Sequence, residues 1–297
     1  MSQRGSLGAD QQREGVAMSD AEPGVPGMGR PRPADAPASR SVTLRATAVL
    51  GAFDREHRCL NLSQLSRRSG LPLATVHRLA ADLVEGRLLV RRGDGRYEIG
   101  ARMWRLGLLA PATDLRELAL PHLQDLVAAT GHTVHLAVPD GATALVIERL
   151  AGTKTIPTRH SPGSRLPLHC TAVGKALLAY APSLLLDEVM VDLRRHTAYT
   201  VTDPRVLHRQ LDEIRRTGLA RSAQEHRLGV SSVAVPVNGH EGVVAAIGLL
   251  APLTSPRLPG ALPHLRAAAA SVSADFLRSG LQSLPPEESG GDRRHQE

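Results

Sequence analysis

The chain has 297 residues, 42% of them hydrophobic, and a formal net charge of +7 at pH 7, so it is long enough for two domains with buried cores. Its two cysteines, Cys59 and Cys170, exclude a disulfide scaffold and lack the spacing of a metal-binding knuckle. No run of about 18 apolar residues occurs, and residues 1–40 lack the apolar core of a secretory signal, so we expect a cytoplasmic protein without a membrane partner.

Positive charge is concentrated between Ser41 and Ala110. This segment contains twelve arginines and six acidic residues, a surplus that accounts for six of the seven net positive charges. The concentration indicates a polyanionic partner, with nucleic acid favoured over an acidic membrane surface. Aromatic residues make up only 2% of the chain, which argues against binding of single strands by base stacking.

Three helical patterns follow one another after the N-terminal tail. The first has apolar residues at positions i, i+3, i+4 and i+7, starting from Ala46. Asn61 and Gln64 form a capping-box pattern at the start of the second helix, and Gly70 ends that helix. After a tight turn, the third helix spans about residues 73–85.

The third helix has two dissimilar faces. Aliphatic residues at helical spacing predict the face that packs on the domain core, and these are Val76, Leu79, Ala80 and Leu83. The opposite face carries small and polar residues, namely Ala74, His77 and Arg78, with Thr75 at its edge. Small residues let the backbone approach DNA closely, and an arginine can donate two parallel hydrogen bonds to guanine in the major groove.

A hairpin with basic flanks follows the third helix. The segment LLVRRGDGRYEIG predicts two short strands joined by a turn, and arginines flank this turn at Arg91, Arg92 and Arg96. This order of elements indicates a winged helix-turn-helix domain over residues 41–100. Its third helix would enter the major groove of double-stranded DNA, and its hairpin would reach phosphates or the minor groove. Each feature alone also fits a solvated basic helix beside a surface hairpin, and the combination with concentrated charge favours DNA.

The remaining chain has a mixed pattern. We expect residues 101–118 to form a helical linker and residues 119–282 to form a second domain of the α+β class. Alternating patterns predict four strands, at about residues 133–138, 144–150, 232–237 and 243–250. Helical patterns lie at about residues 204–217 and 260–277. The polar, proline- and glycine-rich ends, residues 1–40 and 283–297, predict disordered tails.

Four segments resemble the IclR family of bacterial transcriptional regulators. They are GLPLATVHRLAADLVEGRLLVR, RYEIGARMWRLG, LPLHCTAVGKALLA and EHRLGVSSVAVPV. The resemblance covers about residues 41–280 and implies a winged helix-turn-helix domain joined by a helix to a GAF-like effector-binding domain. It also implies homodimers or homotetramers that bind a double-stranded DNA operator and respond to a small organic acid or aromatic metabolite. We therefore expect a ligand-responsive regulator of a catabolic or metabolic operon.

The resemblance also places an effector pocket in the second domain. Backbone amides of Gly163 and Ser164 would bind a carboxylate. Ser222 stands where the family often has an acidic residue, and Ser232 stands where it often has cysteine. Two further positions often carry serines that touch the ligand, and here they are Gly248 and Leu250.

Two histidines are additional pocket candidates. His169 precedes Cys170, which we interpret as a packing cysteine beside a pocket histidine. His135 alternates with the apolar residues of its strand and either lines the pocket or faces solvent. Replacement of the two family serines by glycine and leucine would add room and apolar surface, which favours a larger, more apolar acid such as an aromatic or acyl compound. A pocket that has lost its ligand remains an alternative.

No catalytic, metal or cofactor site is expected. Lys175 lies in a Gly-Lys pair without the glycine pattern of a phosphate-binding loop, so we interpret it as a helix-surface or capping residue. No two of the thirteen histidines stand at i, i+4 spacing, which argues against structural zinc. Two other functions stay open: an architectural DNA binder without an effector, and a metabolic enzyme acting on small acids.

Overall fold

The computed structural model describes residues 41–153, 160–255 and 258–281, so both expected tails lie outside the described residues. The chain divides into two compact units between Ile99 and Gly100. Within the described ranges, no helix combines the length and the apolar character needed to cross a membrane.

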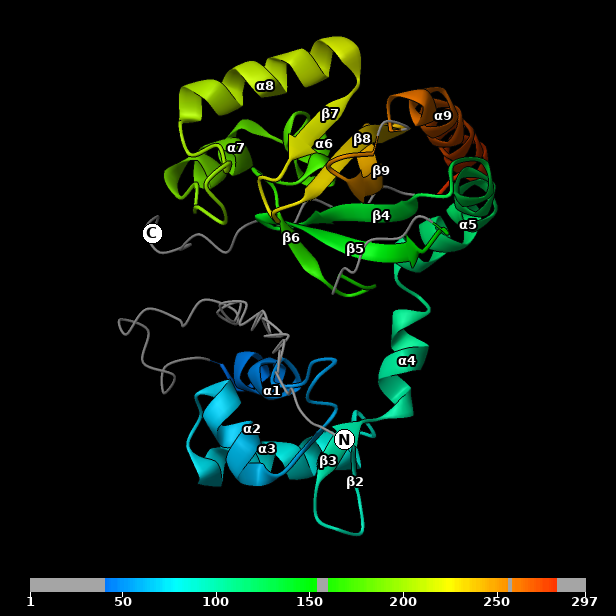
Figure 1. Ribbon diagram of the computed structural model, residues 1–297. Helices are drawn as coiled ribbons and strands as arrows, with labels where there is room; N and C mark the ends of the chain where they lie inside the picture. The colour runs from blue at the N-terminus through cyan, green and yellow to red at the C-terminus, as the bar shows by residue number, and fades with distance from the viewer. Residues whose placement is uncertain (1–40, 154–159, 256–257, 282–297) are drawn as a thin grey trace, which may run out of the picture. The chain divides into compact units, whose positions relative to one another are not determined.

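The first unit is a three-helix domain with a small antiparallel sheet (Figure 1). Its elements are α1 (Val42–Leu50), β1 (Cys59–Leu60), α2 (Leu62–Ser69), α3 (Leu73–Glu85), β2 (Leu89–Arg91) and β3 (Tyr97–Ile99). The sheet order is β1-β3-β2, so β3 lies in the centre. The sequence does not predict strand β1, because two residues are too few to show a strand pattern.

Local signals position the second and third helices as expected. The Asn61 side chain accepts a hydrogen bond from the Gln64 amide at 2.9 Å, and the Gln64 side chain accepts one from the Asn61 amide at 2.9 Å. Gly70 ends α2 with φ 72°, a left-handed conformation that suits glycine. Helix α3 then buries Val76 and Leu79 in a core shared with α1, α2 and the sheet.

The second unit is built on one six-stranded antiparallel sheet with helices on both faces. The sheet order is β6-β5-β4-β9-β8-β7. Its strands are β4 (Thr133–Asp140), β5 (Thr143–Leu150), β6 (Arg165–Pro167), β7 (Ala220–Ala223), β8 (Val230–Gly239) and β9 (Gly242–Pro252). Its helices are α4 (Ala101–Gly107), α5 (Pro111–Thr130), α6 (Ala172–Leu178), α7 (Ser183–Val191), α8 (Pro204–Thr217), η2 (Pro259–Ala261) and α9 (Leu262–Ser279).

Strand alternation sends large and small residues to opposite faces of this sheet. Helices α5 and α9 cover the face with the larger aliphatic residues, while α6, with α7 and α8 behind it, covers the other (Figure 1). The α6 face is lined by Ala137, Ala234, Ala246 and Gly248, which let the helix lie close to the strands. The expected α+β class is therefore confirmed, with an arrangement of helices that periodicity alone did not specify.

Helix α5 begins inside the range of residues that we expected to form the linker. Leu115, Ala119 and Leu123 of α5 are buried in the core between this helix, α9 and the sheet. The expected linker, residues 101–118, therefore overlaps the first turns of a core helix. Sequence periodicity shows that a helix is amphipathic, but it does not show which surface covers the apolar face.

Candidate functional site

Helix α3 presents the surface that the sequence predicts. Val76, Leu79, Ala80 and Leu83 are buried, whereas Ala74, His77 and Arg78 are exposed and Thr75 is half-buried. The polar residues near its start therefore do not pack in the hydrophobic core of their own unit. This geometry leaves one face of the helix available to a partner.

The three hairpin arginines lie on the surface but already have local contacts. Arg92 forms an ion pair with Glu98, and the Arg96 Nε donates to the Asp94 carboxylate at 2.9 Å. These ion pairs raise the pKa of both guanidinium groups. The Arg91 guanidinium lies over the Tyr97 ring, 5.9 Å from its centroid. Because all three are exposed, a phosphate can replace their present partners at small cost.

A cavity opens on the α6 face of the large sheet. Sheet register explains its composition, because Leu250 pairs with Ser232, Ser232 pairs with Ser222, and His135 pairs with Gly248. The cavity is lined by His135, His160, Leu166, Cys170, Thr171, Ala172, Val173, Ser222, Glu225, His226, Arg227, Val230, Ser232, Gly248 and Leu250. Five of the expected effector residues thus come together here: His135, Ser222, Ser232, Gly248 and Leu250.

Three expected effector residues are placed differently. The Gly163 amide donates to the Val146 carbonyl at 2.8 Å, and the Ser164 amide donates to the Ser161 carbonyl at 2.8 Å. Both amides are therefore engaged, the first with strand β5 and the second within the loop, and they do not offer the free donors that we expected. His169 is buried beside the cavity but does not line it.

Gly248 also differs from the expectation that it adds room to the pocket. A Cβ at this position would lie 2.7 Å from Cγ1 of Val173 on α6. The space that a serine would need is therefore filled by the helix, and Gly248 serves the close packing of α6 on β9. Of the two replacements, Leu250 is the one that adds apolar surface to the cavity.

A chain of histidine rings crosses the cavity wall, and sequence patterns identify only part of it. His226 lies at the centre, with its ring 5.2 Å from that of His160 and 4.9 Å from that of His196. The His160 and His135 rings are 6.3 Å apart, and the His169 and His196 rings are 5.8 Å apart. His160, His196 and His226 come from separate loops, so no local spacing signals their contact.

Burial keeps this wall uncharged. Desolvation lowers the pKa of His135 and His226 to about 3, and it also lowers the pKa of His160, His169 and His196. Burial raises the pKa of the Cys170 thiol to about 12. The thiol is therefore protonated at neutral pH, which does not suit an attacking nucleophile.

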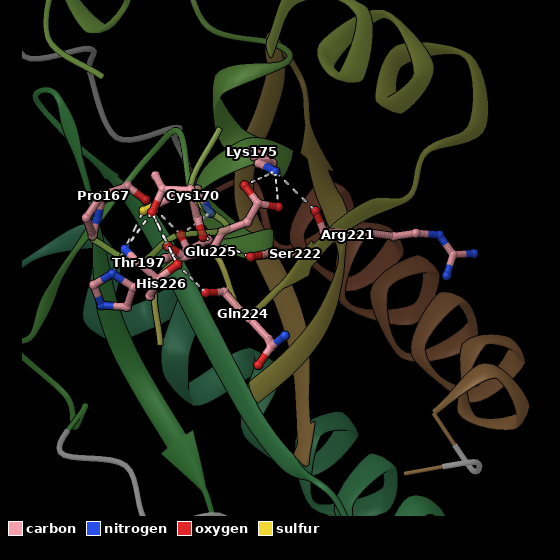
Figure 2. A network of polar contacts seen from close by, with 12 residues as sticks. Pro167, Cys170, Lys175, Thr197, Arg221, Ser222, Gln224, Glu225 and His226 are labelled. Carbon is pink, nitrogen blue, oxygen red and sulfur yellow. Dashed lines mark hydrogen bonds and ion pairs between the residues drawn. The ribbon is translucent and has the colours of Figure 1, made fainter. Parts of the chain in front are cut away.

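A buried ion pair holds the segment that carries Glu225 and His226 (Figure 2). The Lys175 ammonium donates to both carboxylate oxygens of Glu225, at 2.6 and 2.7 Å, and lies 3.4 Å from the Arg221 carbonyl oxygen. Lys175 is 0% exposed, so the expected surface or capping role is wrong. Its helix, α6, lies between the sheet and α8, and the sequence suggests an exposed position only because lysine is rarely buried.

Hydroxyl groups complete this network. Thr200 donates to the Glu225 carbonyl at 2.6 Å, and Thr197 donates to the Gln224 carbonyl at 2.7 Å. Ser222 donates to the Cys170 carbonyl at 2.9 Å, which ties β7 to the segment before α6. Ser222 thus has a structural bond in addition to its place in the cavity wall.

Comparison with known proteins decides the family. A family model described as the bacterial transcriptional regulator IclR C-terminal domain matches residues 109–274, which is more than half of the chain. The IclR helix-turn-helix domain matches residues 42–93. The chain belongs to the IclR family. It is a transcriptional regulator with a helix-turn-helix DNA-binding domain and an effector-binding domain.

Individual relatives of this IclR-family regulator cover most of its length. The probable transcriptional regulator SauR of Cupriavidus necator is 33% identical over 251 residues, 80% of this chain and 98% of the relative. The regulator XynR of Escherichia coli is 31% identical over 215 residues, 71% of this chain and 85% of the relative. An IclR homologue from Microbacterium hydrocarbonoxydans, solved with 4-hydroxybenzoate, has a TM-score of 0.75 and 31% identity, covering 80% of this chain and all of that one.

The buried ion pair generates a stability prediction for this regulator. Lys175→Met leaves the Glu225 carboxylate buried without its partner, and we expect a loss of about 3–5 kcal/mol in the free energy of unfolding. The double variant Lys175→Met/Glu225→Leu removes both charges and is expected to recover most of that loss. Denaturant unfolding monitored by circular dichroism measures both. Equal destabilisation in the single and double variants would contradict this role of the ion pair.

The buried histidines generate a pH prediction. His135 has a folded pKa of about 3 against 6.5 for an unperturbed imidazole, so protonation favours the unfolded chain. Its stabilising contribution is present above pH 6.5 and is lost as the pH falls towards 3, with a slope of about 1.4 kcal/mol per pH unit. The free energy of unfolding should thus fall more steeply between pH 6.5 and 5 in the wild type than in His135→Leu. Parallel curves for the two proteins would show that His135 is already solvated.

Proposed function

We propose that this IclR-family regulator reads an operator through α3 and the β2–β3 hairpin and binds a small aromatic acid in the histidine-walled cavity. The proposal of DNA binding rests on the two faces of α3. This helix buries Val76 and Leu79 while it exposes Ala74, His77 and Arg78. The acid changes the affinity for the operator, which makes the protein a ligand-responsive regulator of a metabolic operon.

The exposed residues of α3 suit the major groove. Ala74 is small enough for close approach of the backbone to the base edges. Thr75, His77 and Arg78 supply polar contacts, and the Arg78 guanidinium can donate to O6 and N7 of one guanine. In the hairpin, Arg91, Arg92 and Arg96 would exchange their local partners for phosphate oxygens and so position the domain without reading sequence.

The cavity suits an aromatic carboxylate. Arg149 pairs across the strands with His135, so its side chain projects from the same face of the sheet, next to the cavity but not among the residues that line it. Burial is the main cause of the lowered pKa of His135 and His160, and the positive charge of Arg149 adds to it in both cases, which is consistent with an arginine near these two rings. The Arg149 Nε is buried and has no hydrogen-bond partner in the part of the chain that the structure describes. A carboxylate would pair with this guanidinium, and neutral imidazole faces would flank the ring.

The binding of 4-hydroxybenzoate by the Microbacterium hydrocarbonoxydans homologue supports this class of ligand. The neutral histidines add hydrogen-bond capacity for a ring substituent, since a neutral imidazole has one donor and one acceptor nitrogen. The apolar side chain of Leu250 replaces a polar contact at the same wall and further favours a ring over a short, polar acid.

Regulation by the acid requires an assembly in which two α3 helices reach two operator half-sites. We propose a homodimer or homotetramer in the cytoplasm, with recognition helices about 34 Å apart or at a multiple of that spacing. The exposed apolar side chains in and just after α4, among them Trp104 at 71% exposure and Leu109 at 78%, support contact with a second copy. An acid that binds one arrangement of the assembly better by a few kcal/mol would shift its affinity for DNA.

The α3 surface generates a prediction for DNA binding. Arg78→Ala removes a bidentate contact with one guanine, so we expect operator binding to weaken by about 1–3 kcal/mol and discrimination at one base pair to relax. Footprinting of the DNA that flanks its own gene locates the operator, and titration of that fragment gives the affinity. Arg216→Ala on α8, where Arg216 is exposed and paired with Glu213, is the matched control and should bind like the wild type. Unchanged operator affinity in Arg78→Ala would refute the groove assignment.

The cavity generates a prediction for the ligand. Calorimetric titration of the wild type with 4-hydroxybenzoate should show binding, whereas Arg149→Met should bind at least about tenfold more weakly because the carboxylate loses a charge-assisted pair worth about 1.5–3 kcal/mol. Arg165→Ala, an exposed arginine paired with Asp140 on the same sheet, is the control and should not differ from the wild type.

The outcomes of this titration separate the alternatives. Tight binding of glyoxylate- or pyruvate-sized acids without binding of aromatic acids would contradict the proposed ligand class. If no acid binds, and none of the tested acids changes the melting temperature, the result would favour an architectural DNA binder without an effector.

A further inference from the structure

Three side chains with metal-binding donors converge at one end of the histidine chain. His169 and Cys170 lie directly before α6, and His196 lies between α7 and α8. One donor atom from each, an imidazole nitrogen or the Cys170 sulfur, lies within 4.8 Å of the other two. We propose that His169, Cys170 and His196 bind a first-row transition metal ion, with Zn²⁺ the best match.

The donor set selects this class of ion. One sulfur and two imidazole nitrogens suit borderline-soft ions such as Zn²⁺ and Co²⁺, whereas Mg²⁺ and Ca²⁺ require oxygen ligands. Three protein ligands are also the number found in zinc sites that keep one open position. A further donor is His226, whose Nδ1 lies 3.8 Å from the Cys170 Sγ. With Zn–S and Zn–N bonds of about 2.3 and 2.0–2.1 Å, two tetrahedral ligand atoms stand about 3.6 Å apart, close to this separation.

The environment of His169 is that of a metal ligand. Its Nε2 lies 2.9 Å from the Arg194 carbonyl oxygen, an acceptor, so Nε2 carries the proton and Nδ1 carries the lone pair. Metal-binding histidines typically donate their second ring N–H to a carbonyl or carboxylate, which fixes the tautomer and the ring orientation. This bond is present in the protein without requiring any rearrangement.

The site has an access path and a balanced binding step. His196 is exposed, whereas His169 and Cys170 are buried, so an ion reaches the buried donors through the His196 side. The Cys170 S–H bond breaks as the metal–sulfur bond forms, and the proton goes to solvent without any change in oxidation state.

The site adjoins the effector cavity but does not depend on the proposed ligand. Cys170 and His226 line the cavity, whereas His169 and His196 are not among its lining residues. The sequence argues against zinc only because no two histidines stand at i, i+4 spacing. In the structure, the tertiary fold brings His169 and His196 together.

Titration of the full-length, chelator-treated protein with Co²⁺, followed by competition with Zn²⁺, tests the proposal. We expect one ion per chain, a thiolate-to-cobalt charge-transfer absorption, and displacement of Co²⁺ by Zn²⁺. Cys170→Ala should lose the charge-transfer absorption, and His196→Ala should weaken Co²⁺ binding at least about tenfold. His196 is exposed, so this variant should retain its fold, which the melting temperature without metal checks.

Two matched controls keep the assignment specific. Cys59→Ala removes the other cysteine, and His240→Ala removes an exposed histidine at the β8–β9 turn, and both should bind Co²⁺ like the wild type. Substoichiometric binding would overturn the proposal. The same holds if Cys170→Ala and His196→Ala bind as tightly as the wild type, or if Cys59→Ala removes the absorption. None of these measurements uses DNA or an organic acid, so their failure would leave the proposed regulatory function intact.

Discussion

The buried ion pair between Lys175 and Glu225 is the constraint on which the effector domain depends. Removing two charges from water costs several kcal/mol for each ion, and their close contact and added hydrogen bonds must offset that cost. The Lys175 ammonium makes these bonds to Glu225 from the centre of α6. The segment that carries Glu225 and His226 is therefore held in one position against the helix that begins after Cys170. Both the cavity wall and the proposed metal site are built from the residues beside this contact.

Close packing of α6 depends on small residues as well as on the ion pair. Gly174 belongs to α6, and a Cβ there would lie 2.5 Å from the Pro167 carbonyl oxygen. Gly248 provides the equivalent clearance on the strand side, against Val173. A position that differs from the family's serine pattern is thus explained by packing, and the difference in ligand contacts rests on Leu250. The two observations together shape a cavity with an apolar floor and a wall of neutral imidazoles.

The DNA-binding unit uses a simpler principle. Its third helix buries one face in the core and leaves the other exposed, and its core is built mainly from aliphatic residues of the three helices and the small sheet. The effector domain instead concentrates titratable groups in a low-dielectric region, where burial shifts their pKa values far from those in water. The first unit is thus stabilised mainly by aliphatic packing, whereas the second also contains desolvated titratable groups.

The sequence by itself determined the elements whose signals are local. The capping box at Asn61, the helix end at Gly70 and the two faces of α3 depend on residues three or four positions apart, and the structure agrees with all three. Family motifs likewise identified both domains, and strand alternation identified His135 as a candidate for the cavity.

Only the tertiary structure decided the chemistry of the cavity wall. Lys175 and Glu225 are 50 residues apart, and His160 and His226 are 66 residues apart. Such contacts arise from strand register and from the choice of sheet face that each helix covers. Periodicity within a segment specifies neither, because it records which side of a segment is apolar and not what that side meets.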